Sequence, residues 1–224
     1  MEPLPFDAAL AAKIDHTLLA PDAREIDVQR LCDEARRFGF ASVCVNPSWV
    51  RLCRANLRDS GTAVCTVIGF PLGCNRTDMK AREAEGALQD GAVEFDMVLH
   101  IGRLRQGDFA YVEQDIAAVA AVVKRESDSN ILKVILETSL LTAREIENAC
   151  GLAVAADADF VKTSTGFGGG GATTEAVRLM RRVVGSDFGV KASGGIRTRA
   201  DALAMIEAGA SRIGASASIA IVRT

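Results

Sequence analysis

The chain has 224 residues, of which 49% are hydrophobic and 25% charged, and its 26 basic and 29 acidic side chains give a formal net charge of −3. This is the composition of an ordinary globular protein, and it excludes the basic surface typical of a nucleic-acid-binding protein. No apolar stretch reaches transmembrane length and residues 1–5 show no secretory signal, so we expect a cytoplasmic protein without a membrane partner.

The cysteines argue against both a zinc site and a disulfide framework. The six cysteines include no C-x-x-C pair, and only two histidines are present. Zinc sites commonly use such pairs, and disulfide frameworks belong to small secreted domains. We therefore expect reduced thiols and no metal. Cys44 lies in an apolar strand pattern, and its default interpretation is a small buried residue.

Short apolar runs alternate with helical patterns along the whole chain. The predicted strands, in chain order, are residues 14–18, 42–45, 63–68, 93–101, 131–136, 160–162, 189–192 and 212–214. The predicted helices are residues 25–38, 78–89, 109–125, 142–155, 173–184 and 199–207, with a short extra helix at 7–13. A capping-box pattern opens the helix at Thr142, and Gly39, Gly91 and Gly209 follow three of the helices.

Eight such units predict an α/β fold, a (β/α)₈ TIM barrel that forms a single domain over residues 1–224, with the short helix added at its N-terminus. Several strands are almost continuous apolar runs, as expected for parallel strands covered on both faces. An open doubly wound sheet uses the same alternation and is the structural alternative. No linker or low-complexity stretch divides the chain.

Two lysines end predicted strands in similar surroundings. Lys162 is followed by Thr-Ser-Thr-Gly, and Lys191 by Ala-Ser-Gly-Gly. In a barrel of this kind, the carboxyl ends of the strands form the functional face. Two ammonium groups brought close together disfavour each other's charge, so the pKa of one falls, and a partly neutral lysine can form a Schiff base with a carbonyl. One lysine alone would be interpreted as a solvated surface residue, but the repeated pair favours chemistry.

Asp96 is a carboxylate within an apolar strand pattern. Alternation places Glu94, Asp96, Val98 and His100 on one face of the strand. A carboxylate inside a barrel is costly unless it is paired, and lysines on neighbouring strands, including Lys133, are candidate partners. A structural ion pair is one interpretation, and proton transfer beside a reactive lysine is the other.

Glycine-rich loops follow the last three predicted strands. Gly166 to Gly171 formally matches G-x-G-x-x-G, which leaves an NAD(P)-dependent oxidoreductase as an alternative. With residues 194–197 and 214–216, this loop also fits the place where barrels often bind phosphate, although tight turns alone would need glycines. The residues therefore predict a phosphorylated carbonyl substrate, a Schiff-base lysine and a nearby proton carrier, without naming the substrate.

Seven segments spread over nearly the whole chain carry a family resemblance. They are residues 14–19, 43–45, 69–73, 94–98, 133–138, 160–167 and 191–197. In this order they resemble the deoxyribose-phosphate aldolases, which are class I aldolases. The resemblance implies reversible cleavage of 2-deoxy-D-ribose 5-phosphate to D-glyceraldehyde 3-phosphate and acetaldehyde, with neither metal nor cofactor. We expect a homo-oligomer, either a dimer or a tetramer.

The resemblance also assigns roles to individual residues. Lys162 matches the Schiff-base lysine, Lys191 the lysine that keeps it partly uncharged, and Asp96 the carboxylate that helps proton transfer, through water. The other matching residues support the site, contact the substrate or surround its phosphate. They are Asp15, Thr17, Cys44, Lys133, Thr165, Gly166, Gly194, Gly195, Arg197, Gly214 and Ser216.

Three positions depart from the family pattern. His100 stands where the family usually has asparagine, and Ala217 where some members carry a second serine. The last residue is Thr224, where some members have a tyrosine that assists protonation. Lys162, Lys191 and Asp96 are all present, which favours catalysis over a non-catalytic sugar-phosphate-binding barrel.

Overall fold

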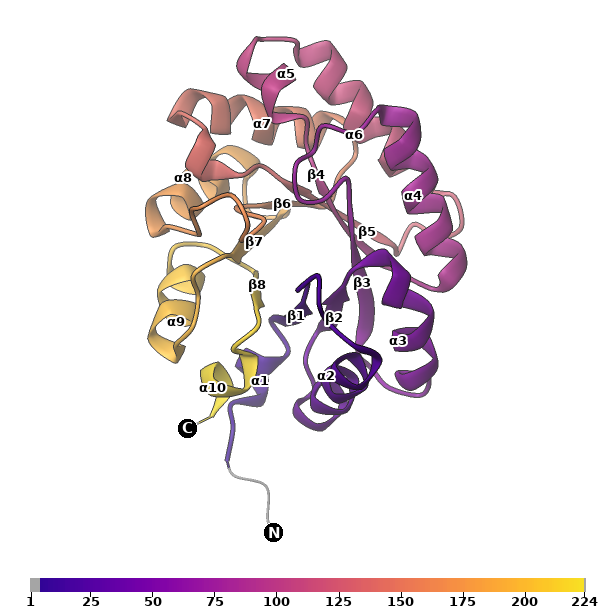
Figure 1. Cartoon of the computed structure of the whole chain (residues 1–224). Coiled ribbons are helices and arrows are strands. Elements are labelled where there is room, and N and C mark those ends of the chain that lie inside the picture. The colour runs from indigo at the N-terminus through magenta and orange to yellow at the C-terminus, as the bar shows by residue number, and fades with distance from the viewer. Residues whose placement is uncertain (1–4, 224) are drawn as a thin grey trace.

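The computed structural model describes residues 5–223, in which eight parallel strands form a closed barrel surrounded by helices (Figure 1). In chain order the strands are β1 (Ile14–Leu18), β2 (Ser42–Val45), β3 (Ala63–Ile68), β4 (Glu94–Val98), β5 (Ile131–Ile135), β6 (Phe160–Lys162), β7 (Gly189–Ser193) and β8 (Arg212–Ala215). Each strand pairs with the next, and β8 closes on β1. The predicted TIM barrel is confirmed, and the doubly wound alternative is wrong. Residues 1–4, used for the signal-sequence expectation, and Thr224 lie outside the described residues.

Helices fill the connections between the strands. They are α1 (Ala8–Ala11), α2 (Glu25–Phe38), α3 (Val50–Asn56), α4 (Thr77–Asp90), α5 (Ile101–Arg105), α6 (Phe109–Lys124), α7 (Ala143–Ala155), α8 (Thr174–Val184), α9 (Arg199–Glu207) and α10 (Ser218–Val222), with 3₁₀ turns η1 (Pro47–Trp49) and η2 (Thr138–Leu140). The helices α3, α5 and α10 were not predicted, because five to seven residues are too few to establish a hydrophobic period. Within residues 5–223, no helix combines the length and the apolarity needed to cross a membrane.

Local signals set several helix ends where the sequence placed them. Gly39 ends α2 with a left-handed φ of 66°, which a residue without Cβ adopts readily. Thr142 caps α7, and its side chain and that of Glu145 bond each other's backbone amides in a capping box. The extra helix α1 is shorter than predicted and spans four residues.

The barrel register brings the polar residues of different strands to the same level. Asp96 on β4 is the partner of Lys133 on β5, and Lys162 on β6 is the partner of Lys191 on β7. Neighbouring residues such as Phe95 point outward into the apolar layer beneath the helices. Because successive side chains of a strand alternate, the apolar layer and the polar interior are encoded in the same short runs.

One expectation about β4 is wrong. The strand ends at Val98 instead of continuing to residue 101, and His100 is the N-cap of α5. Its ring accepts a hydrogen bond of 3.3 Å from the backbone amide of Arg103 and meets the Tyr111 ring edge-on. His100 therefore does not share a face with Asp96, because the strand ends three residues earlier than predicted and the chain then starts a helix.

Candidate active site

A cavity of about 440 Å³ opens at the carboxyl ends of the strands, the end that the sequence singled out. Lys162 lies at its floor, and the connections after β1, β6, β7 and β8 form its walls. The predicted site residues that line it are Thr17, Lys162, Thr165, Gly166, Gly194, Gly195, Arg197, Gly214 and Ser216. The cavity also has lining residues that were not predicted, which are Leu18, Leu19, Ala20, Pro21, Phe167, Ser193, Ile196 and Ala215.

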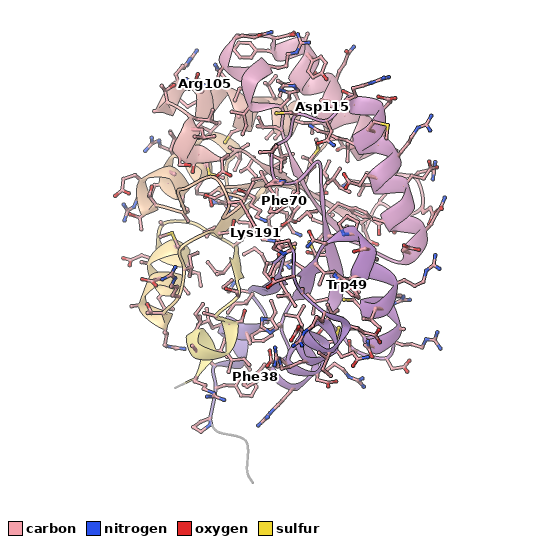
Figure 2. All side chains as sticks on the ribbon, in the orientation of Figure 1. Phe38, Trp49, Phe70, Arg105, Asp115 and Lys191 are labelled. Carbon is pink, nitrogen blue, oxygen red and sulfur yellow. The ribbon has the colours of Figure 1, made fainter. Side chains whose placement is uncertain are left out.

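Beneath this floor, one carboxylate binds three lysines. Oδ2 of Asp96 accepts hydrogen bonds from Nζ of Lys162 at 2.7 Å and Nζ of Lys191 at 2.6 Å. Its Oδ1 accepts one from Nζ of Lys133 at 2.9 Å. Figure 2 places Lys191 near the centre of the barrel, well away from the outer helices. The structure thus brings together four residues from four strands that the sequence had separately marked as polar.

Further charged residues extend the cluster toward the amino ends of the strands. Asp15 binds Lys191 and accepts a hydrogen bond of 2.6 Å from Arg212. Glu94 lies 2.6 Å from Nζ of Lys133 and also contacts Arg212. Sequence reasoning assigned no role to Glu94 or Arg212. Alternation along the strand had placed Glu94 on the same face as Asp96, and this could have identified Glu94 as a member of the cluster.

Opposite charges decide the protonation states within the cluster. Burial favours the neutral acid at Asp96, but Lys133, Lys162 and Lys191 outweigh it and hold the pKa of Asp96 well below its usual value. Burial likewise opposes the charge of Lys191, but Asp15 and Asp96 outweigh it and raise the pKa of Lys191. The expectation that two close lysines repel each other was incomplete, because Asp96 binds both ammonium groups and Asp15 binds Lys191 as well. Lys191 is consequently charged at neutral pH.

Lys162 differs from the other two lysines because its side chain reaches the cavity. Lys133 and Lys191 are completely buried and are not among the lining residues of the described chain. The hydroxyl of Thr163, next to Lys162, donates to the Ser193 carbonyl at 3.0 Å and accepts from the Ser193 amide at 3.0 Å. This exchange fixes the ends of β6 and β7 together, so Lys162 presents its amine to the cavity from a rigid support.

Two glycine positions shape the cavity around the lysines. A Cβ on Gly214 would lie 3.0 Å from Cε of Lys191, so the bare backbone there leaves room for that side chain to cross the barrel. Gly194 has a left-handed φ of 86°, and its Cβ would lie 3.0 Å from Cα of Gly171. The loops after β6 and β7 therefore pack directly backbone against backbone beside the cavity.

Comparison with known proteins decides the family. The sequence model of the DeoC/LacD family of aldolases matches residues 9–222. The chain belongs to the DeoC/LacD aldolase family. The family predicted from the sequence is thus confirmed.

Relatives of this DeoC/LacD aldolase are similar over nearly their whole length. A deoxyribose-phosphate aldolase of Thermoanaerobacter sp. (strain X514) is 56% identical over 213 residues, covering 95% of each chain. One of Bacillus subtilis (strain 168) is 54% identical over 215 residues, covering 96% of this chain and 95% of the relative. The tetrameric deoxyribose-phosphate aldolase of Aeropyrum pernix has a TM-score of 0.89 at 34% identity, covering 96% of this chain and 89% of that structure. The aldolase QR15 has a TM-score of 0.88 at 40% identity, covering 95% and 93%.

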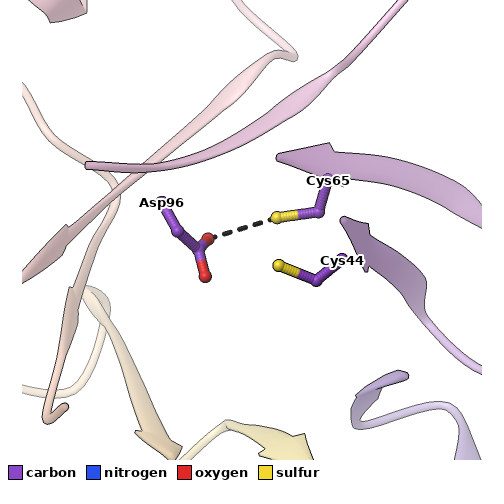
Figure 3. A group of neighbouring side chains, drawn as sticks. All are labelled: Cys44, Cys65 and Asp96. Atoms are coloured by element: carbon purple, nitrogen blue, oxygen red, sulfur yellow. Dashed lines mark hydrogen bonds between the residues drawn. The ribbon is translucent and has the colours of Figure 1, made fainter. Parts of the chain in front are cut away.

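In this DeoC/LacD aldolase, Cys44 was predicted to be a substrate-binding residue, but it lies below the cavity surface. It is completely buried and packs with Cys65, Leu19 and Val67. Figure 3 shows Cys44 beside Cys65, whose thiol donates to Oδ1 of Asp96 at 3.2 Å. Within the described chain, Cys44 is not one of the residues lining the cavity.

Among residues 5–223, two buried groups offer sets of atoms that could hold a metal ion. They are Cys44, Cys65 and Asp96, and Asp15, Cys65 and Glu94, each with its ligand atoms within 4.8 Å of one another. The three carboxylates are already bound by the ammonium groups of Lys133 and Lys191 or the guanidinium of Arg212. A cation would have to displace these charged partners, so the arrangement favours the lysine cluster over a metal centre.

Proposed function

We propose that this protein reversibly cleaves 2-deoxy-D-ribose 5-phosphate to D-glyceraldehyde 3-phosphate and acetaldehyde through a Schiff base on Lys162. The observation that carries the proposal is the amine of Lys162 at the cavity floor, 2.7 Å from Asp96 and beside the charged Lys191. The named activity of the relatives from Thermoanaerobacter and Bacillus supports the choice of substrate.

Cleavage of the C2–C3 bond of the sugar releases an electron pair, and the reaction needs a group that accepts this pair. The amine of Lys162 attacks the C1 aldehyde of the open-chain sugar, water leaves, and a protonated imine forms. The C3 hydroxyl then gives up its proton as the C2–C3 bond breaks, and the bonding pair passes to the imine nitrogen as an enamine. Glyceraldehyde 3-phosphate leaves. The enamine takes a proton at C2, and hydrolysis of the resulting imine releases acetaldehyde and restores the amine.

Asp96 and Lys191 prepare this chemistry in different ways. Asp96 is ionised, so it can accept a proton and, through water, return it to the reacting carbons. Lys191 keeps its charge and shares Oδ2 of Asp96 with Lys162. Lys191 thus places a fixed positive charge beside the amine that reacts. The remaining buried partners, Asp15 and Lys133, hold these groups in position.

The test of the proposed function combines turnover with chemical trapping. The protein should convert 2-deoxy-D-ribose 5-phosphate to the two aldehydes in the presence of EDTA, because the imine is the electron sink and no Lewis acid is required. Borohydride added with substrate should reduce the imine, and peptide mass mapping should locate the adduct on Lys162. Turnover lost in EDTA and restored by zinc would contradict the lysine mechanism.

The two alternatives to this function are tested by the same preparation. Two glycines of residues 166–171 are packed closely, since a Cβ on Gly168 would lie 2.7 Å from the Glu137 carboxyl and one on Gly170 would lie 2.4 Å from the Ser139 side chain, while Gly166 and Gly169 have open space at that position. Such packing indicates that these glycines are needed to fit neighbouring protein side chains, and it argues against a loop that binds the pyrophosphate of a dinucleotide. Nicotinamide cofactor binding to the pure protein would favour an oxidoreductase, and sugar-phosphate binding without turnover would favour a non-catalytic barrel.

The phosphate end of the substrate is proposed to lie among Gly194, Gly195, Arg197, Gly214 and Ser216, which line one part of the cavity wall. The exposed guanidinium of Arg197 has no ion-pair partner within residues 5–223. Arg197→Ala should therefore raise KM about tenfold for deoxyribose 5-phosphate, the scale of a charge-assisted hydrogen bond, and much less for deoxyribose. Steady-state kinetics on both sugars measure this. The control is Arg178→Ala, at an exposed arginine on α8, which should leave KM for both sugars unchanged. Equal effects of Arg197→Ala on both sugars would contradict the assignment.

Lys191→Met should move borohydride trapping at Lys162 to higher pH. Removing the neighbouring positive charge lets the Lys162 amine hold its proton more readily. A displacement of one pH unit would reduce trapping near neutral pH about tenfold. Lys191→Arg keeps the charge and serves as the matched variant, whose profile should stay near that of the wild type. An unchanged profile in Lys191→Met would show that Lys191 has another role.

We also propose a cytoplasmic homo-oligomer, a dimer or a tetramer. The tetrameric relative from Aeropyrum pernix supports oligomerisation, and six free cysteines, five of them buried, suit a reducing compartment. Light scattering on the purified protein measures the number of subunits directly.

A further inference from the structure

Glu137 adopts a backbone conformation that residues with side chains rarely use. It follows β5 with φ 56° and ψ 62°, in the left-handed region. The chain on both sides stays bonded to the end of β6 and the residue after it, since the amide of Leu136 donates to the Lys162 carbonyl and that of Thr138 donates to the Thr163 carbonyl, both at 2.9 Å. Such a conformation persists where the surroundings hold it, and it is found disproportionately at functional sites.

The bend turns the Glu137 side chain inward, where it is 2% exposed. Its Oε2 accepts a hydrogen bond of 3.2 Å from the amide of Thr165 and another from the Thr165 hydroxyl. That hydroxyl in turn accepts from the amide of Phe167 at 3.0 Å. Through these hydrogen bonds, the side chain of Glu137 orders three consecutive residues.

These three residues form part of the cavity wall. Thr165, Gly166 and Phe167 line the cavity that holds Lys162, and the Phe167 ring meets the Phe70 ring edge-on, with 5.4 Å between centroids. A Cβ on Gly168 would lie 2.7 Å from both the carboxyl carbon and Oε2 of Glu137, so the rest of this loop also lies against the same carboxylate. Glu137 itself does not line the cavity that holds Lys162, although it lines a neighbouring pocket on the other side of Thr165 and Phe167.

We propose that Glu137 is a positioning residue for the aldolase reaction, acting through Thr165 to hold residues 165–167 in place around the substrate. The left-handed bend at the end of β5 aims the carboxylate at this wall, and the side chain touches the wall without reaching the substrate. The substrate assignment rests on the proposed function. The carboxylate has no part in the proton transfers described above, which are confined to the cluster around Asp96.

The test distinguishes the effect of the Glu137 carboxylate from the effect of the left-handed backbone at this position. Glu137→Gly removes the carboxylate but keeps the conformation, because glycine adopts left-handed angles freely. We expect KM for deoxyribose 5-phosphate to rise and kcat/KM to fall about tenfold, with faster amide hydrogen exchange at Thr165 and Phe167. Asp157→Gly is the matched control. Asp157 has a φ of 61°, is exposed and lies before β6 at the other end of the barrel, so this variant should retain wild-type kinetics.

A second set of variants keeps the proposal testable if Glu137→Gly does not fold. Glu137→Gln preserves the shape and one acceptor oxygen, and should recover most of the KM. Glu137→Asn also tolerates left-handed angles, but its side chain is too short to reach Thr165, so it should raise KM. Combining Glu137→Asn with Thr165→Val should add little to the effect of Thr165→Val alone, because coupled residues are not additive. Additive losses, or wild-type KM with wild-type exchange in Glu137→Gly, would overturn the proposal. A wild-type protein inactive on deoxyribose 5-phosphate would refute the proposed function, while the exchange measurement would still test the role of Glu137.

Discussion

Lys162→Ala should abolish both turnover of deoxyribose 5-phosphate and the adduct trapped by borohydride. No other side chain within the described cavity lining supplies an amine, since Arg197, the other cation there, is a guanidinium. The loss in kcat should be on the order of 10⁴-fold or more, the scale for removing a catalytic nucleophile. Asp96 keeps Lys133 and Lys191 as partners in this variant, so the barrel should remain folded.

Circular dichroism and mass mapping make this result interpretable. Lys13→Ala, at an exposed lysine before β1, should leave turnover and the adduct unchanged. The far-ultraviolet spectrum of Lys162→Ala should match the wild type, which attributes the loss to chemistry. An adduct mapped to Lys133 or Lys191 in the wild type would contradict the assignment of Lys162 as the nucleophile.

Asp96→Asn should lower the free energy of unfolding by about 3–5 kcal/mol at neutral pH and also abolish turnover. Asparagine has nearly the same shape but no charge, so Lys162 loses the only ion-pair partner it has among the described residues. Lys191 keeps its ion pair with Asp15, and Lys133 keeps its ion pairs with Asp15 and Glu94. Denaturant unfolding gives the stability, and steady-state kinetics on the folded protein give the activity.

The pH dependence of this effect has a definite sign. The folded-state pKa of Asp96 is lowered well below 3.8, so its charge stabilises the fold at every pH above that value. The contribution disappears only as the pH falls through the lowered pKa. The difference in stability between the wild type and Asp96→Asn should thus be constant from about pH 5 to 8 and shrink in strong acid. A difference that grows on acidification would show that Asp96 is not ionised in the folded protein.

Asp115→Asn is the matched control, because Asp115 is also a completely buried carboxylate that binds a buried lysine. Its Oδ2 lies 2.5 Å from Nζ of Lys80, between α6 and α4, and Figure 2 shows Asp115 in the outer helical layer. This variant should lose a comparable amount of stability while its folded fraction keeps the wild-type kcat/KM. Equal losses of activity in both variants would mean that destabilisation alone explains Asp96→Asn.

Much of the barrel could be predicted because its signals are local. The strands β1, β2, β3 and β6 and the helices α2 and α9 have the predicted bounds, since apolar runs, caps and glycines mark their ends within a few residues. The strand-end lysines were recognisable for the same reason. The helices of five to seven residues were missed because so short a segment carries no period.

What could not be predicted depends on contacts across the barrel. Asp96 of β4 binds both Lys162 and Lys191, and Asp15 of β1 binds Lys191. Both carboxylates are far from the two lysines in sequence, so their effect on the lysine charges is visible only once the barrel has closed. The inward side chain of Arg212 begins a strand, where a basic residue would ordinarily be solvated. The left-handed backbone at Glu137 could not be predicted either, because glutamate, unlike glycine or asparagine, does not favour that conformation.

The polar interior is divided by sign between the two halves of the barrel. The inward acids Asp15, Glu94 and Asp96 all come from β1 and β4, and their cationic partners Lys133, Lys162, Lys191 and Arg212 come from β5 to β8. If either half were duplicated to make a whole barrel, the inward charges contributed by its strands would all have the same sign. The amino-terminal and carboxyl-terminal halves are therefore complementary parts instead of interchangeable repeats, and fragments separated between α6 and β5 would each need the other to neutralise their interior.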